Sequence, residues 1–67
     1  MEFELTTEYI ELNKLLKLLG WVESGGFANM AISDGLVAVN GDTETRKRKK
    51  LRAGETVEFK GKKVTIK

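Results

Sequence analysis

Cysteine, histidine and proline are absent from this chain of 67 residues. Without cysteine it can form no disulfide, no thiol nucleophile and no thiolate metal site. Without histidine it has no imidazole base, and the hydroxyls of Ser24 and Ser33 lack the partner that would activate them. The glycine patterns that bind nucleotides are missing as well. The composition therefore predicts a protein that is not an enzyme and has no catalytic residue, no metal and no cofactor.

Long apolar segments are also missing. The longest apolar run, residues 36–39, has four residues, whereas a membrane-spanning helix needs about 20. Residues 1–4 are acidic where a targeting peptide would be basic. We therefore expect a cytoplasmic protein in which residues 1–67 form one domain, because the chain is too short for two.

Charge is distributed unevenly along the chain. Residues 1–45 carry two basic and eight acidic side chains, a formal charge of −6, whereas residues 46–67 carry ten basic and two acidic ones, a formal charge of +8. A small domain with this asymmetry has one face that attracts anions. Residues 46–52 are the most basic stretch, with six cations among seven residues: Arg46, Lys47, Arg48, Lys49, Lys50 and Arg52.

The first predicted helix covers residues 10–19. Its leucines recur at spacings of three and four residues, and Gly20 follows where such a helix needs a residue with positive φ. Asn13, Lys14 and Lys17 are expected on the outer face. The two lysines are candidates for contact with an anion, although a pair of surface lysines usually only keeps a protein soluble. The apolar face contains Leu12, Leu15, Leu16 and Leu19.

The second predicted helix begins after Ser24, a typical N-cap, runs to about residue 34 and stops at Gly35. The segment Ser24-Gly25-Gly26 has two interpretations. Its free amides can bind phosphate, or its small residues allow the two helices to pack closely. Phe27, Ala28, Ala31 and Ile32 are expected to face the first helix, and Gly26, Asn29 and Ser33 the opposite side.

Alternating apolar and polar residues predict strands over residues 3–6, 56–59 and 63–66. The segments on either side of Asn40-Gly41, residues 36–39 and 43–45, are also predicted to be strands. Asn40-Gly41 is the strongest hairpin signal, because both residues accept the positive φ of a type I′ turn. Further turns are expected at residues 53–55 and at Gly61-Lys62. The predicted fold class is α+β, with two short packed helices against a small, mostly antiparallel β-sheet. The aromatic residues expected in the core are Tyr9, Trp21, Phe27 and Phe59. Trp21 has an alternative interpretation, as a platform on which a nucleic-acid base stacks.

The basic run at residues 46–52 is the main functional signal. A run of like charges is usually a solvated loop. Here the run lies between two predicted hairpins, and its repulsion destabilises the fold unless an anion offsets it. We therefore interpret it as a contact with nucleic-acid phosphates. Alternation along an extended segment would let about three or four of its side chains reach one row of phosphates.

Residues 12–59 also resemble a known family. The most specific part is residues 37–41, which follow a helix ending in glycine and precede residues 51–55. The chain is similar to S4 RNA-binding domains, and in particular to the small free-standing bacterial proteins of the YbcJ/YaaA type. The matching positions are Leu12, Leu15, Gly20, Ser24, Ala28, Ile32, Gly35, Val37, Val39-Asn40-Gly41, Leu51, Gly54-Glu55 and Val57.

The resemblance implies an S4-like (αL) fold, whose two helices and following β-turn form an L-shaped surface for structured RNA. It also implies ribosomal RNA as the usual ligand and a role in ribosome assembly. Two departures remove positive charge from the helices: Gly25 stands where many S4 domains have Arg, and Glu11-Leu12-Asn13 where many have Arg-Leu-Asp. The basic run is therefore expected to make more of the contact. The predicted RNA-binding residues are its six cations together with Ser24, Gly25, Gly26, Asn29, Asn40, Lys14 and Lys17.

The expected partners are structured RNA and ribosomal particles, bound by a monomer through shape and phosphate position. An alternative is a protein-interaction module whose basic face binds an acidic protein. Attachment to anionic lipid is a third possibility. It is disfavoured because no predicted helix combines an apolar face with a basic one at the surface.

Overall fold

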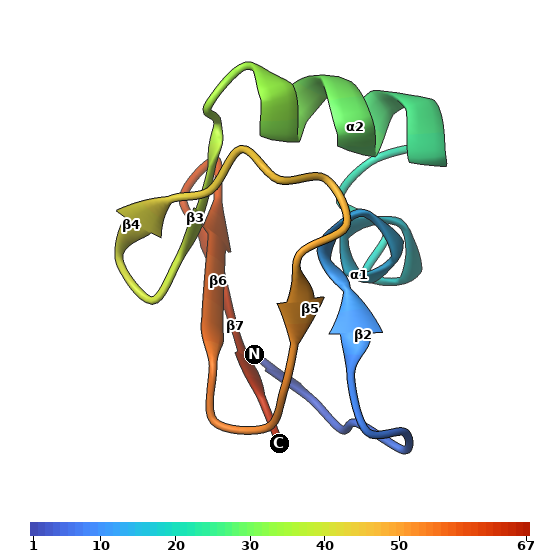
Figure 1. The fold of residues 1–67 in the computed structure, drawn as a ribbon, viewed down its shortest axis with the longest axis vertical. Helices are drawn as coiled ribbons and strands as arrows, with labels where there is room; N and C mark the ends of the chain where they lie inside the picture. The colour runs from blue at the N-terminus through green and yellow to red at the C-terminus, as the bar shows by residue number, and fades with distance from the viewer.

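The computed structural model describes residues 1–67 and has two layers, in which two helices cover one face of a five-stranded sheet (Figure 1). The sheet has the order β1-β7-β6-β3-β4, and only the β1–β7 pair is parallel. A separate antiparallel pair, β2–β5, lies beside α1. The elements are β1 (Glu2–Phe3), β2 (Ile10–Glu11), α1 (Leu12–Leu18), α2 (Gly25–Ser33), β3 (Val37–Val39), β4 (Asp42–Thr43), β5 (Lys50–Leu51), β6 (Thr56–Phe59) and β7 (Lys62–Ile66).

Helix α1 is shorter than predicted. Residues 10 and 11 do not begin the helix but form β2, where Ile10 lies opposite Leu51 and Glu11 opposite Lys50. Pairing with a strand about 40 residues downstream outweighs the local helical pattern here. The helix ends as expected, since Gly20 has a φ of +72°.

Helix α2 begins and ends as predicted. The Ser24 hydroxyl accepts a hydrogen bond from the Phe27 amide at 3.3 Å, and Gly35 follows the helix with a φ of +75°. The assignment of side chains to its faces was partly wrong. Phe27 is 54% exposed, and Asn29 accepts a hydrogen bond from the Asn13 side chain at 3.0 Å. The two asparagines therefore join the helices instead of lying on their outer sides.

The β3–β4 hairpin confirms the predicted turn, because Asn40 and Gly41 have φ values of +53° and +87°. The β6–β7 turn is formed by Lys60 and Gly61, one residue earlier than expected. The strand predicted over residues 3–6 is shorter and begins one residue earlier, at Glu2–Phe3, which pairs with β7. The predicted strands at residues 36–39 and 43–45 are also shifted, to Val37–Val39 and Asp42–Thr43.

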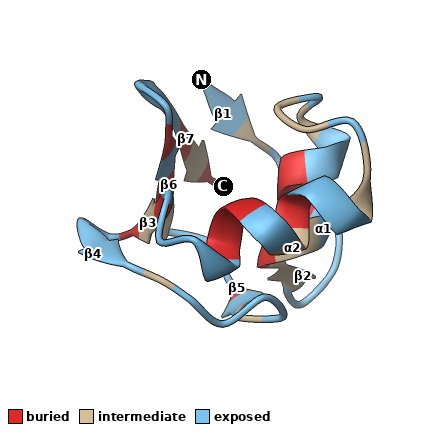
Figure 2. Cartoon of the chain, turned by 90° about the horizontal axis from the view of Figure 1, so that it is seen from above, coloured by how far each residue is buried: buried red, intermediate tan, exposed pale blue.

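The core lies between the helices and the sheet, as the buried residues in Figure 2 show. Phe59 is buried as predicted, and Trp21 is half-buried against the core. Tyr9 and Phe27 are exposed, so their assignment to the core was wrong. Neither helix is long and apolar enough to span a membrane. The buried residues are all apolar: Leu12, Leu15, Leu16, Ala28, Ala31, Ile32, Val37, Val39, Leu51, Val57, Phe59, Val64 and Ile66.

Candidate nucleic-acid interface

The basic segment, residues 46–52, follows β4, passes close to α1 and includes β5 (Figure 1). Its backbone is attached to the start of that helix: the Leu12 amide donates to the Lys49 carbonyl at 2.9 Å, and the Asn13 amide to the Lys47 carbonyl at 3.1 Å. The N-cap residue Glu11 makes no capping bond with its side chain. The basic segment therefore satisfies amides that a local cap would otherwise satisfy. It is an ordered part of the fold, with side chains that remain largely exposed.

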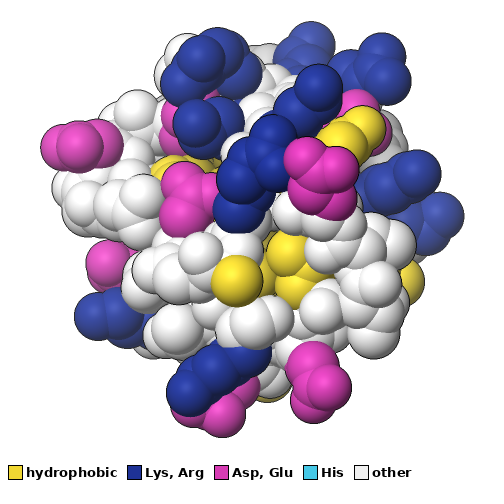
Figure 3. Space-filling model, turned by 60° about the horizontal axis from the view of Figure 1, so that its bottom comes forward, with side chains coloured by type: hydrophobic (Ala, Val, Ile, Leu, Met, Phe, Trp, Pro, Cys, Tyr) yellow, Lys and Arg dark blue, Asp and Glu magenta, His cyan; other side chains and the backbone are white.

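Each of the three arginines in this segment is paired with a glutamate. Arg46 binds Glu44 through Nε and Nη2, at 2.9 and 3.1 Å. In the other two pairs, Arg48 Nε donates to Glu11 at 3.0 Å and Arg52 Nη1 to Glu8 at 3.2 Å. Acidic side chains lie among basic ones on the face in Figure 3. The glutamates limit where the guanidinium groups can lie, whereas the three lysines have no carboxylate partner.

The Arg46–Glu44 pair alters the acidity of both groups. Hydrogen bonds from the Arg46 side chain lower the pKa of Glu44 below its ordinary value of 4.5, and this effect exceeds the opposing effect of burial. The same contact raises the pKa of Arg46. Each member of the pair therefore stabilises the charged form of the other.

Five of the six cations line one shallow surface depression, which we call the basic depression: Arg46, Arg48, Lys49, Lys50 and Arg52. No acidic or apolar residue lines it. The segment turns at Lys47 and Arg48, and the Lys49 amide donates to the Arg46 carbonyl at 3.3 Å. Because of this turn the side chains do not alternate as they would along a straight strand. The depression therefore brings together five cations and leaves out Lys47.

Tyr9 lies at the edge of the basic depression. Lys50 Nζ is 4.9 Å from the centre of its ring, and the Arg52 guanidinium carbon is 5.8 Å away. These distances are in the range of cation–π contacts. The sequence did not mark this tyrosine as a candidate, because an isolated aromatic residue near an apolar segment is usually part of the core. Only the β2–β5 pairing places it beside these cations.

The predicted contacts on the helices are not part of the basic depression. A Cβ atom on Gly25 would meet nothing within 4 Å, and one on Gly26 would meet only the Ser24 hydroxyl, at 3.7 Å. These glycines are therefore not required for close helix packing, and that interpretation was wrong. Asn29 is bonded to Asn13. Lys14 lines a neighbouring groove together with Arg48, whereas Lys17 lines neither surface.

Asn40 has a structural role. Its side-chain oxygen accepts a hydrogen bond from the Thr56 amide at 3.0 Å, and its side-chain nitrogen donates to Glu55 at 3.3 Å. The carboxylate of the same Glu55 accepts a hydrogen bond from the Arg52 backbone amide at 2.6 Å. The β3–β4 turn is thereby connected to the end of the basic segment.

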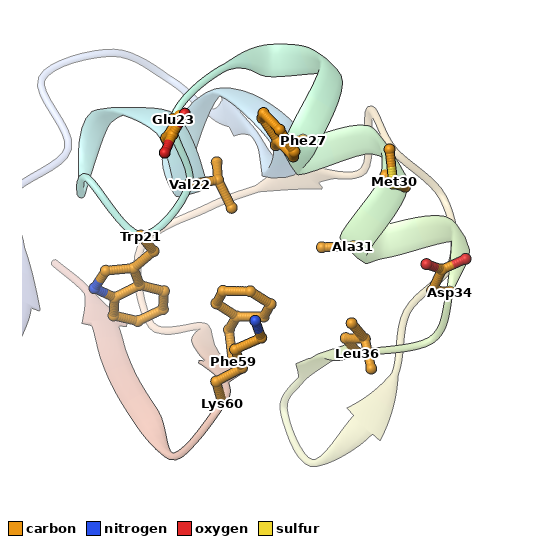
Figure 4. A pocket seen from close by; sticks show the side chains of 10 residues that line it. All are labelled: Trp21, Val22, Glu23, Phe27, Met30, Ala31, Asp34, Leu36, Phe59 and Lys60. Atoms are coloured by element: carbon orange, nitrogen blue, oxygen red, sulfur yellow. The ribbon is translucent and has the colours of Figure 1, made fainter.

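Trp21 lies away from the six cations. It stacks on Phe59, with ring centres 6.4 Å apart and planes at 22°. Both rings line an apolar groove beside α2, together with the exposed side chains of Phe27, Met30 and Leu36 (Figure 4). None of the six cations lines this groove. Trp21 therefore packs against the core and does not border the basic depression.

Residues 3–67 match the family model described as "S4 domain". The chain belongs to the S4 domain family. This S4 domain is 53% identical over 58 residues to the Escherichia coli protein described as "Putative RNA-binding protein YbcJ", a match that covers 87% of this chain and 83% of that protein. It is 39% identical over 57 residues to the Bacillus subtilis protein described as "Probable ribosome maturation protein RlbA", covering 85% and 80% of the two chains.

A solved structure is similar to this S4 domain as well. The solution structure of YbcJ from Escherichia coli, described as containing an αL motif involved in RNA binding, matches with a TM-score of 0.73 and 50% identity. The match covers 97% of this chain and 84% of that one. The expected S4-like (αL) fold and the likeness to the YbcJ type are thereby confirmed.

Proposed function

We propose that this S4 domain binds structured RNA, ribosomal RNA in particular, and performs no catalysis. The observation that carries the proposal is the basic depression, in which five cations and no carboxylate line one exposed surface. Lysine and arginine side chains that converge in this way neutralise consecutive phosphates and release bound counterions. Arginines already held by glutamates lose less side-chain freedom when they meet a phosphate.

The relatives support RNA as the ligand. One is described as RNA-binding and another as a ribosome maturation protein. We further propose that this domain acts in the cytoplasm as a monomer, on ribosomal RNA or on ribosomal particles during their assembly. Few exposed amides and aromatic rings are available to read base sequence, so recognition rests mainly on shape and phosphate position.

The N-terminus of α2 is proposed as a second, weaker contact. The Gly25 and Gly26 positions border open space, and Ser24 begins the helix with its positive dipole end. Asn29 follows in the same helix, and Lys14 lies on the neighbouring helix α1. The proposed contact here is weaker, because a helix dipole stabilises an anion by only about 0.3–1 kcal/mol.

A competition experiment tests the proposal. The domain is bound to a labelled, folded fragment of ribosomal RNA, and unlabelled RNA or duplex DNA of the same length is added. We expect RNA to compete more strongly than duplex DNA, because the proposed surface recognises the shape of folded RNA. A surface that bound phosphate charge alone would not distinguish the two nucleic acids. Equal competition would contradict recognition of structured RNA. Complexes isolated from cells should also be disrupted by ribonuclease, whereas complexes that survive it would favour an acidic protein partner.

A further inference from the structure

A second groove adjoins the basic depression. Its apolar lining includes Phe3, Leu5 and Ile10, and its other lining residues include Tyr9 and Arg48. Arg48 lines the basic depression as well, and Tyr9 contacts two of the cations there. The two surfaces are therefore continuous. We call this second surface the N-terminal groove. On the face in Figure 3, apolar atoms are exposed beside lysine and arginine side chains.

We infer that the N-terminal groove holds one unpaired nucleobase of the RNA, stacked on Tyr9. This inference rests on the proposed function and adds a preference for RNA with a bulged or looped-out nucleotide.

The composition of the groove favours a base over a phosphate. Glu8 and Glu11 line it together with Lys14 and Arg48, so its charges offset one another. Each glutamate uses one carboxylate oxygen for its arginine, Glu8 for Arg52 and Glu11 for Arg48. The remaining oxygens repel a phosphate but can accept hydrogen bonds from the amino groups of a base.

Tyr9 has the exposure and the neighbours that a stacking platform needs. Tyr9 is 38% exposed, and the cationic groups of Lys50 and Arg52 lie over its ring, 4.9 and 5.8 Å from the ring centre. A nucleotide whose base lies on this ring would have its phosphates next to cations of the basic depression. The carbonyl of Tyr9 accepts a hydrogen bond from the Thr7 hydroxyl at 2.8 Å, which orders the loop that carries the ring. A prealigned ring binds a base at a smaller entropy cost.

Two RNA hairpins with the same stem test the inference, one with a single bulged 2-aminopurine and one without it. The wild-type domain should bind the bulged hairpin about 5- to 150-fold more tightly, the range that one base–aromatic stack provides, and should quench its fluorescence. Tyr9→Ala should abolish the preference and the quenching while still binding the plain hairpin. Tyr9→Phe should retain both. Phe27→Ala removes an exposed ring that lies outside the groove, so it should behave as wild type.

The outcomes separate this inference from the proposed function. Equal binding of both hairpins by the wild type would overturn the inference alone. An equal loss of affinity for both hairpins in a folded Tyr9→Ala variant would also overturn it, because the ring would then act only by supporting Lys50 and Arg52. Lys49→Gln should weaken binding to both hairpins equally. If the wild type binds neither hairpin at low salt, the proposed function itself fails.

Discussion

Glu11 and Arg48 are 37 residues apart in the chain, yet the carboxylate of Glu11 accepts a hydrogen bond from Arg48 Nε at 3.0 Å. The Glu11 side chain is 18% exposed and that of Arg48 is 78% exposed. The glutamate is thus the fixed partner, and it holds the arginine where the basic depression and the N-terminal groove meet. An acidic residue at this position, where many S4 domains have Arg, helps to place a cation.

Glu11→Gln should reduce the free energy of unfolding by less than about 1 kcal/mol, because one partner of the pair is largely in water. The same change should raise RNA affinity several-fold at low salt, since it removes a negative charge beside five cations. Urea denaturation and RNA titration measure the two effects. Glu23→Gln, an exposed acid that lines the apolar groove, is the control and should change neither. A lower RNA affinity in Glu11→Gln would mean that positioning Arg48 outweighs the repulsion.

Lys49 and Lys47 form a matched pair for testing the basic depression. Neither lysine has a carboxylate partner, and the backbone carbonyl of each accepts a hydrogen bond from an amide of α1. Only the Lys49 side chain lines the depression. Lys49→Gln should weaken RNA binding and reduce the slope of log affinity against log salt by about 0.7–0.9, the contribution of one neutralised phosphate. Lys47→Gln should leave the slope nearly unchanged. RNA titrations at several salt concentrations decide this. Equal effects would show that the whole segment, and not the depression, attracts the RNA.

Arg46→Gln should raise the pKa of Glu44 towards 4.5, because the hydrogen bonds that lower it are lost. A carboxyl with a lowered pKa in the folded state stabilises the fold above its unfolded pKa, and this contribution disappears as the pH falls through the folded pKa. The variant should therefore be less stable than wild type at neutral pH and equally stable in strong acid. NMR titration of the Glu44 carboxyl carbon and urea denaturation at both pH values measure this. An unchanged Glu44 titration would contradict the pairing.

Gly41→Ala should destabilise the domain by about 1–2 kcal/mol, because φ at this position is +87° and a Cβ atom is unfavourable there. A Cβ atom on Gly41 would meet nothing within 4 Å, so the effect would come from the backbone alone. Gly25→Ala is the control. Its Cβ atom also meets nothing, but Gly25 has no positive φ and begins a helix, so the change should be neutral or stabilising. Thermal melting of both variants tests this turn. Equal melting temperatures would contradict a positive φ at Gly41.

Features that depend only on neighbouring residues could be predicted from the sequence. The Ser24 cap, the Gly20 and Gly35 helix ends and the Asn40-Gly41 turn are local, because each needs only a side chain or a backbone preference within a few residues. The buried face of α1 follows from the spacing of its leucines. The positive net charge of residues 46–67, and with it the expected preference for an anionic ligand, is likewise a property of composition.

Features that depend on segments far apart in the chain could not be predicted from the sequence and follow from the fold. Strands β2 and β5 pair across some 40 residues, and this pairing shortens α1, caps it with the basic segment and brings Tyr9 beside Lys50 and Arg52. Two-residue strands such as these show no alternation in the sequence, so no local pattern reveals them. The gathering of five cations around one depression has the same cause, since it needs the turn at Lys47 and Arg48 and the docking of that turn on α1.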